Sequence, residues 1–200
     1  MAMIRQSAEK NKSAKKGRVS SSFKGAFANL TYVKESFSQG CYEGSKMDGL
    51  RNGYGTYYYS EGGKYCGDWL TNKMHGKGTL YYADGRIAYQ GEWKNDCLDG
   101  WGILYNEKPV SLTQPYDYQC FDQAEESWVY YEGPFRQDDK SGNNGRLVLS
   151  NGERYEGDFK NDMVDGKGIF YTLDNKKILG EWEANRLVRV ITSVSSSQCD

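Results

Sequence analysis

The segments YCGDWLTNKMHGKG at residues 65–78 and YQGEWKNDCLDGWG at residues 89–102 repeat one pattern. Each opens with an aromatic residue, a glycine and a second aromatic residue at every second position, and each closes on two glycines separated by one residue. Residues at every second position share one face of a β-strand. The acidic residues between them, such as Asp68 and Glu92, then belong to the opposite, solvated face. The opening triplet therefore predicts a half-buried strand.

The same pattern recurs along most of the chain. Five clear copies and a degenerate sixth begin at Tyr42, Tyr65, Tyr89, Tyr131, Tyr155 and Ile178. Successive starts are separated by 23, 24, 42, 24 and 23 residues, so the long gap equals one repeat plus an insertion of 18 residues. A fixed period of this length indicates an array of one supersecondary unit.

Turn residues divide each copy into two strands. The eighth position holds residues that tolerate a left-handed backbone, namely Gly49, Asn72, Asp96, Asp138, Asp162 and Asn185. In four copies a Gly-x-Gly pair then opens a second strand, whereas the fourth copy keeps Gly142 and has Asn144 in the second place. Further turn pairs, such as Asp84-Gly85, suit the tight turns that join antiparallel strands. We therefore expect an all-β fold, an elongated twisted array of tandem antiparallel β-hairpins.

Composition and charge agree with this fold class. Of 200 residues, 24 are Gly and 17 are Tyr, which favours turns and aromatic strands. The net charge of −1 conceals a basic segment, residues 1–24 at +6, and an acidic remainder at −7. No apolar run reaches the roughly 20 residues that span a bilayer as a helix. Five cysteines without a CxxC pair are expected to be reduced thiols in the cytoplasm.

The repeats resemble the MORN (membrane occupation and recognition nexus) repeat, whose pattern is close to YxGxWxxGxxxGxG. The resemblance covers residues 42–104 and 131–187, where aromatic, turn and glycine columns agree in register. One departure is Lys46, which stands where the family has an aromatic residue. The resemblance implies an array with an aromatic-lined groove that serves in assembly and anchoring. Family roles include cytoskeletal and axonemal scaffolding, binding of a helix in the groove, self-association and phospholipid contact.

The pattern predicts six segments along the chain. They are a basic disordered arm at 1–24, an N-terminal cap at 25–41, repeats one to three at 42–105, an aromatic insertion at 106–130, repeats four to six at 131–187, and a C-terminal cap and tail at 188–200. The caps would cover the two sheet edges, because exposed strand edges invite aggregation.

The aromatic columns are the predicted partner-binding groove. Its residues are Tyr42, Tyr65, Trp69, Tyr89, Trp93, Tyr131, Phe135, Tyr155, Phe159 and Trp182, with Tyr58, Tyr81, Tyr105 and Tyr171 from the second strands. A single sheet has no second layer over both faces, and exposed aromatic surface marks interaction sites. Which column holds the sheet and which meets the partner stays open at this point. The groove hypothesis predicts that Trp69→Ala with Trp93→Ala removes partner binding and keeps the strand content.

Two further segments are candidate contacts. The insertion either folds back on the groove or docks a partner through Tyr116, Tyr118, Phe121 and Trp128. The arm suits an acidic surface, such as a tubulin tail or anionic lipid, through Lys10, Lys12, Lys15, Lys16 and Arg18.

The sequence offers no catalytic or metal-binding constellation. His75 is the only histidine and lies in a turn, so no Ser-His-Asp or Cys-His arrangement can form without it. No compact loop gathers carboxylates for calcium. The Gly-x-Gly pairs lack the following helix that phosphate-binding loops need. We expect no enzyme, no cofactor, no metal and no nucleic-acid partner.

These observations predict a non-enzymatic protein–protein interaction scaffold that binds an apolar, helical partner segment in the aromatic groove. The resemblance alone implies a cytoplasmic, cytoskeleton-associated setting such as a cilium or axoneme, with cytoskeletal protein partners. A homo-oligomer is a further alternative. The rival function is a peripheral membrane tether, in which the arm and the repeat surface bind anionic phospholipid.

Overall fold

A computed structural model describes residues 30–195, which form fourteen β-strands, one short 3-10 helix and no α-helix. The all-β fold of antiparallel hairpins is thereby confirmed. The chain divides into two compact units. The first contains the residues up to Arg86 together with Glu92–Cys97, and the second contains Ile87–Gly91 and the residues from Leu98 onward. Strand β6 (Ile87–Lys94) contributes residues to both units.

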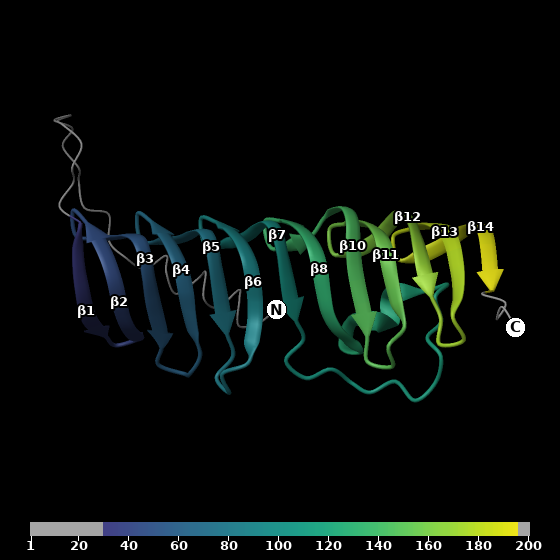
Figure 1. The fold of residues 1–200 in the computed structure, drawn as a ribbon, viewed down its shortest axis with the longest axis horizontal. Helices are drawn as coiled ribbons and strands as arrows, with labels where there is room; N and C mark the ends of the chain where they lie inside the picture. The colour runs from purple at the N-terminus through teal and green to yellow at the C-terminus, as the bar shows by residue number, and fades with distance from the viewer. Residues whose placement is uncertain (1–29, 196–200) are drawn as a thin grey trace, which may run out of the picture. The chain divides into compact units, whose positions relative to one another are not determined.

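The first unit is an open ladder of antiparallel hairpins (Figure 1). Its strands pair in chain order and are β1 (Thr31–Phe37), β2 (Gly40–Met47), β3 (Leu50–Tyr59), β4 (Lys64–Leu70) and β5 (Lys73–Tyr81). Strand β1, from the segment expected to cap the array, is the terminal strand of this ladder.

The second unit repeats the arrangement with more strands (Figure 1). They are β7 (Cys97–Tyr105), β8 (Trp128–Arg136), β9 (Asp139–Lys140), β10 (Gly142–Leu149), β11 (Arg154–Lys160), β12 (Met163–Tyr171), β13 (Lys176–Glu183) and β14 (Arg186–Ser195). The short β9 pairs with β8 beside the main path of the ladder. The segment between β7 and β8 contains the 3-10 helix η1 (Phe121–Glu126).

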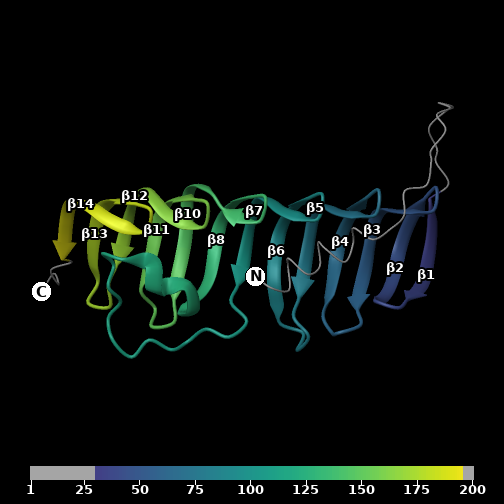
Figure 2. The same cartoon turned by 180° about the vertical axis from the view of Figure 1, so that it is seen from behind.

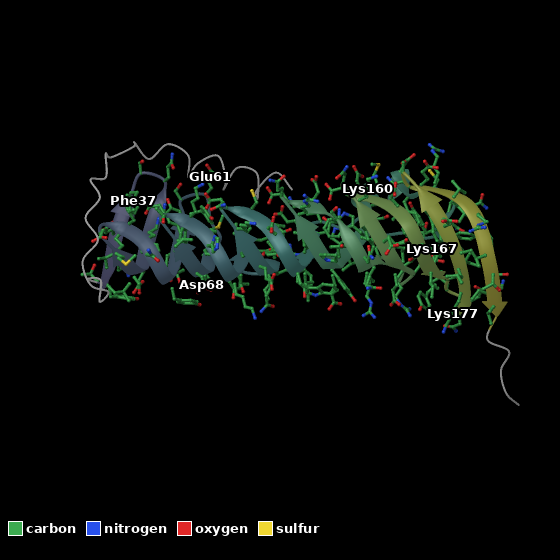
Figure 3. All side chains as sticks on the ribbon, turned by 90° about the horizontal axis from the view of Figure 1, so that it is seen from above. Phe37, Glu61, Asp68, Lys160, Lys167 and Lys177 are labelled. Carbon is green, nitrogen blue, oxygen red and sulfur yellow. The ribbon has the colours of Figure 1, made fainter. Side chains whose placement is uncertain are left out.

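Side chains alternate between two faces in each unit. On β4, Tyr65 and Trp69 are buried on what we call the inner face, whereas Cys66 and Asp68 lie on the outer face. Figure 3 shows Asp68 on the side of the first unit opposite to Phe37. The second unit has the same two faces, and its core gathers on the inner one.

Aromatic rings on the inner face form an edge-to-face ladder. Tyr65, Tyr131 and Tyr155 each contact the third-position ring of their own repeat and that of the next repeat, and Tyr42 and Tyr89 contact that of the next repeat. The ring centroid of Tyr65 lies 5.2 Å from both Trp69 and Trp93, and that of Tyr155 lies 5.4 Å from Phe159 and 5.1 Å from Trp182. Edge-to-face pairs of this kind stabilise a core by about 0.5–1.5 kcal/mol each beyond the burial of their area.

Glycine is required where each tyrosine ring crosses the strands. The ring of Tyr65 lies over Gly67 and Gly78, which are paired across β4 and β5, and its hydroxyl donates to the Asp68 carbonyl oxygen at 3.0 Å. A Cβ atom at Gly78 would fall 2.5 Å from Cζ of Tyr65, inside van der Waals contact. The second glycine of the Gly-x-Gly pair therefore makes room for a ring, as expected for a close approach.

The fourth repeat keeps its second glycine, so the expectation that Asn144 replaces it was wrong. Gly145 pairs with Gly157, and a Cβ atom there would meet the Tyr131 hydroxyl at 2.7 Å. The repeat has one extra residue, and Asn144 accommodates it with a positive φ of 63°. A bulge therefore displaces the glycine by one position along the sequence.

The eighth-position side chains tie each hairpin tip to the preceding repeat. Asp138, at φ 75°, accepts a hydrogen bond on Oδ1 from the Leu98 backbone N–H at 2.7 Å and donates its own N–H to the Leu98 carbonyl at 2.9 Å. The same pair of bonds joins Asn72 to Arg51, Asp96 to Met74, Asp162 to Lys140 and Asn185 to Val164. We call this contact the tip clasp.

Asp138→Gly is expected to destabilise the second unit by about 1–3 kcal/mol, because the buried Leu98 N–H loses its acceptor while glycine still tolerates the left-handed backbone. Asp138→Asn is the matched control, since its amide oxygen can accept the same bond. Denaturant unfolding followed by circular dichroism measures both. Equal stability of the two variants would contradict a role for the tip clasp.

Burial raises the pKa of Tyr42 to about 12, and it raises the pKa of Tyr65, Tyr131 and Tyr155 further. An acid whose folded pKa exceeds its unfolded value, about 10 for tyrosine, stabilises the fold below that value and loses the contribution as pH rises through the folded pKa. We expect the strand signal to decline only above pH 10, together with a rise in tyrosinate absorbance at 295 nm. Full ionisation of all tyrosines near pH 10 with an unchanged strand signal would contradict their burial.

Candidate partner-binding surfaces

The structure places the first- and third-position aromatic residues in the core. These are Tyr42, Tyr65, Trp69, Tyr89, Trp93, Tyr131, Phe135, Tyr155, Phe159 and Trp182, all of which are buried. Trp69 is only 3% exposed, and its indole N–H donates to the Gly55 carbonyl oxygen at 3.1 Å. The predicted groove is corrected here, because side chains that are at most 4% exposed cannot line an open groove.

The second-strand column lies on the opposite face. Tyr58, Tyr81, Tyr105 and Tyr171 are on the outer face and are partly or largely exposed. Each follows the second glycine of its Gly-x-Gly pair by three positions, and an odd offset changes the face of a strand. The inner face instead takes the residues two positions after that glycine, which are Tyr57, Leu80, Leu104 and Phe170. The two predicted columns therefore do not line one surface.

The insertion folds back on the inner face of the second unit. Figure 2 shows the segment between β7 and β8 in front of the strands when that face is turned toward the viewer. Phe121 is 3% exposed, and its ring centroid lies 5.4 Å from Tyr155, 6.0 Å from Phe170 and 6.2 Å from Trp182. Tyr118 stacks on Phe170 at 5.5 Å. The sequence left two alternatives open, and the structure shows the insertion folded back on the inner face.

Polar contacts anchor the same segment. The carboxylate of Glu153, which is almost fully buried, accepts the Tyr116 N–H at 2.6 Å and the Leu173 N–H at 3.3 Å. The Trp182 indole N–H donates to the Tyr118 carbonyl oxygen at 2.9 Å. The sequence analysis missed Glu153, because one acidic residue after an Asn-Gly turn carries no signal of burial. Trp128, predicted to be part of the insertion, is instead the first residue of β8.

Phe121→Ala is expected to release the insertion while the strands stay folded, because Phe121 is the ring that this segment inserts among three others. Limited proteolysis should then cleave residues 107–127 at least about tenfold faster than in the wild type, since removing a buried ring costs several kcal/mol. Val110→Ala is the matched control, because Val110 is exposed in the same segment. Equal cleavage rates in the two variants would contradict docking through Phe121.

Exposed tyrosines gather on the outer face of the first unit. Tyr32 on β1, and Tyr54 and Tyr58 on β3, are 72%, 63% and 42% exposed, and we call them the tyrosine patch. The Tyr32 hydroxyl donates to Glu43 at 3.3 Å, so acidic and phenolic groups lie together there. A solvated sheet face normally carries polar residues, and grouped aromatic side chains on it indicate an interaction surface.

Among residues 30–195, no group of three or more His, Cys, Asp or Glu side chains is arranged to hold a metal ion. Among the described residues, Cys41, Cys66, Cys97 and Cys120 form no disulfide. No helix in the described part of the chain has the length and apolar character needed to cross a bilayer. The basic arm with Lys10, Lys12, Lys15, Lys16 and Arg18 lies outside the described residues.

Tandem antiparallel hairpins, held together by tyrosine rings that lie over paired glycines, define a β-hairpin repeat protein. Four of the repeats are MORN repeats, because the model of the MORN repeat matches residues 42–64, 65–85, 89–103 and 155–172. The matched segments leave out the fourth copy, where the extra residue breaks the spacing. MORN repeats generally serve in binding to proteins or membranes.

Curated relatives are similar over part of the chain. Human Alsin is 28% identical over 152 residues, which are 74% of this chain and 8% of Alsin. Rat Alsin is 29% identical over 105 residues, which are 52% of this chain and 5% of that protein. MORN repeat-containing protein 3 of Xenopus laevis is 39% identical over 54 residues, 27% of this chain and 21% of the relative. The chain thus matches less than a tenth of the length of either Alsin.

Proposed function

We propose that this chain is a non-enzymatic scaffold whose protein partner docks on the outer face of the first unit, over the tyrosine patch. The exposure of Tyr32 on β1 and of Tyr54 and Tyr58 on β3, all on the outer face, is the observation that carries the proposal. Tyrosine is enriched among the residues that dominate binding energy, because it brings a large apolar area and a hydroxyl with little rotamer entropy to lose.

The packing of the inner face supports placing the partner outside. A helix lying in a groove needs open ring faces, whereas Tyr65 and Trp69 already contact rings of adjoining repeats. In the second unit the insertion occupies the inner face. The partner segment remains apolar and helical in this proposal, and its anchors at i, i+3 and i+4 meet the patch.

Affinity purification with quantitative mass spectrometry tests the proposal. Tyr54→Ser with Tyr58→Thr should lower recovery of the specific partner at least about tenfold, the loss expected when two aromatic anchors are truncated. Tyr171→Thr is the matched control, because it changes an outer-face tyrosine of the second unit at the repeat position of Tyr58. Binding of the recovered partner to the purified variants then shows whether the contact is direct.

The circular dichroism signal and thermal midpoint of the double variant should match those of the wild type, since its side chains are exposed. Undiminished partner binding by the double variant would refute the tyrosine patch as the docking site.

Flotation with anionic liposomes, with and without residues 1–24, tests the rival membrane tether. Lipid binding that disappears with the arm, combined with partner recovery that survives the patch variant, would favour the tether.

We also propose a cytoskeletal setting, such as a cilium or axoneme, which the family resemblance alone supports. Imaging of a tagged full-length chain together with tubulin tests it. A diffuse cytoplasmic signal that is lost on detergent extraction would contradict the setting and leave the patch proposal intact.

A further inference from the structure

A shallow cavity of about 280 Å³ opens on the outer face of the second unit. It is lined by Trp101 from β7, Glu132 from β8, Asn144 and Arg146 from β10, and Glu156 from β11. Figure 3 shows polar side chains projecting on both sides of this unit, with Lys177 on the side opposite to Lys160. The lining therefore combines one aromatic side chain with charged and polar groups.

The cavity lies where the repeat pattern breaks twice. In the fifth repeat, Asp158 accepts the backbone N–H of Lys167, the residue between the two glycines, and Asp68 accepts that of Lys77 in the second repeat. The fourth repeat has Pro134 at this aspartate position, and Pro134 pairs with Trp101. Its Gly-x-Gly spacing is also widened by one residue, with Asn144 at φ 63°. Bulges of this kind are over-represented next to functional sites, where they redirect side chains.

The two carboxylates of the cavity differ in how closely they are paired with arginine side chains. Arg146 Nε lies 3.0 Å from Glu156 Oε1, which also receives Arg154 Nε at 3.0 Å. Glu132 lies 3.9 Å from Arg146, at the limit of an ion pair, and its side chain is 35% exposed. The lining carries a formal charge of −1 from two carboxylates and one guanidinium. Glu132 is therefore the group with the capacity to accept hydrogen bonds from an incoming cation.

Trp101 supplies the second element of a cation site. Its side chain is 49% exposed at the wall of the cavity. Tryptophan gives the strongest cation–π attraction of the aromatic residues, and a guanidinium can stack on its ring while donating to a carboxylate. A phosphate or carboxylate would instead be repelled by Glu132, since Arg146 is already paired with Glu156.

We propose that this cavity binds an arginine side chain of a partner protein, with the guanidinium stacked on Trp101 and hydrogen-bonded to Glu132. The inference rests on the proposed scaffold function and names the side chain that a partner places on the second unit. It does not depend on the tyrosine patch, because a short arginine peptide can be tested without the partner.

Titration of the full-length chain with the peptide acetyl-Gly-Arg-Gly-amide, followed by two-dimensional NMR, tests the proposal. Saturable shifts are expected at the Trp101 indole N–H and at the amides of Glu132 and Arg146, with Trp101→Leu identifying the indole signal. Glu132→Gln should weaken binding of the peptide about tenfold, since the neutral amide loses the charge-assisted hydrogen bond to the guanidinium. Glu43→Gln is the matched control at the same repeat position in the first unit and should leave the affinity unchanged.

Deletion of Asn144 gives a second variant, because it restores the regular Gly-x-Gly spacing and closes the cavity. We expect the thermal midpoint of this variant to equal or exceed that of the wild type. The peptide should no longer change its chemical shifts. If it fails to fold, Glu132→Gln still decides the question. Equal binding by Glu132→Gln and the wild type, or equal shifts with acetyl-Gly-Glu-Gly-amide, would overturn the proposal, and neither outcome would bear on the tyrosine patch.

Discussion

Gly78→Ala is expected to unfold the β4–β5 hairpin and to destabilise the first unit by about 3 kcal/mol or more, the upper range for overpacking a core. The new Cβ atom would fall 2.5 Å from Cζ of Tyr65 and closer still to the hydroxyl oxygen. Neither side can yield, because Tyr65 is fully buried and packed between Trp69 and Trp93. Denaturant unfolding followed by circular dichroism measures the loss.

Gly85→Ala separates this collision from the backbone preference of glycine. No atom lies within 4 Å of the position that its Cβ atom would occupy, and its φ is +87°. Its cost is therefore that of a left-handed backbone alone, about 1–2 kcal/mol. If Gly78→Ala cost no more than Gly85→Ala, the ring would not lie over the glycine pair.

Trp69→Ala is expected to cost about 3–5 kcal/mol, as for other buried aromatic residues truncated to alanine. The indole contacts Tyr42 at 5.5 Å and Tyr65 at 5.2 Å between ring centroids, and the Arg51 guanidinium lies 4.4 Å from its ring. Strand content and partner binding should therefore be lost together. This replaces the sequence-based expectation that Trp69→Ala with Trp93→Ala would spare the strand signal.

Trp101→Ala is the matched control for Trp69→Ala, since the same residue type is 49% exposed there. We expect its free energy of unfolding to lie within about 0.5 kcal/mol of the wild type, as for other exposed positions. Thermal unfolding of the two variants side by side measures the difference. Equal destabilisation by the two substitutions would contradict the assignment of Trp69 to the core.

The hairpins and their turns could be predicted from the sequence because both depend on local chemistry. Alternation at every second residue and the Gly, Asn or Asp at the eighth position indicate strands and tight turns without any tertiary information. The sequence also indicates that Tyr58 lies on the opposite face from Gly55, since counting in steps of two from Gly55 reaches Tyr57 and Tyr59 instead. The tip clasp left a weaker signal: a side chain with an acceptor oxygen in every copy except the first, which has Gly49.

The remaining features depend on contacts between distant residues. The insertion has no strand or helix periodicity, and its anchors Glu153 and Trp182 lie 37 and 64 residues beyond their partners Tyr116 and Tyr118. The second glycine of the fourth repeat was missed because fixed spacing cannot reveal a one-residue bulge. Only the pairing of Gly145 with Gly157 establishes which residue takes the glycine position.

The α-proton NMR shifts of the glycines test the stacking of tyrosine rings over glycine pairs most directly. Protons beneath an aromatic ring move upfield, so Gly55, Gly78, Gly102 and Gly168, which lie against the rings of Tyr42, Tyr65, Tyr89 and Tyr155, should all be displaced. The turn glycines Gly49, Gly85 and Gly152, with no atom within 4 Å of their Cβ positions, should keep ordinary shifts. Ordinary shifts at all seven glycines would contradict the account.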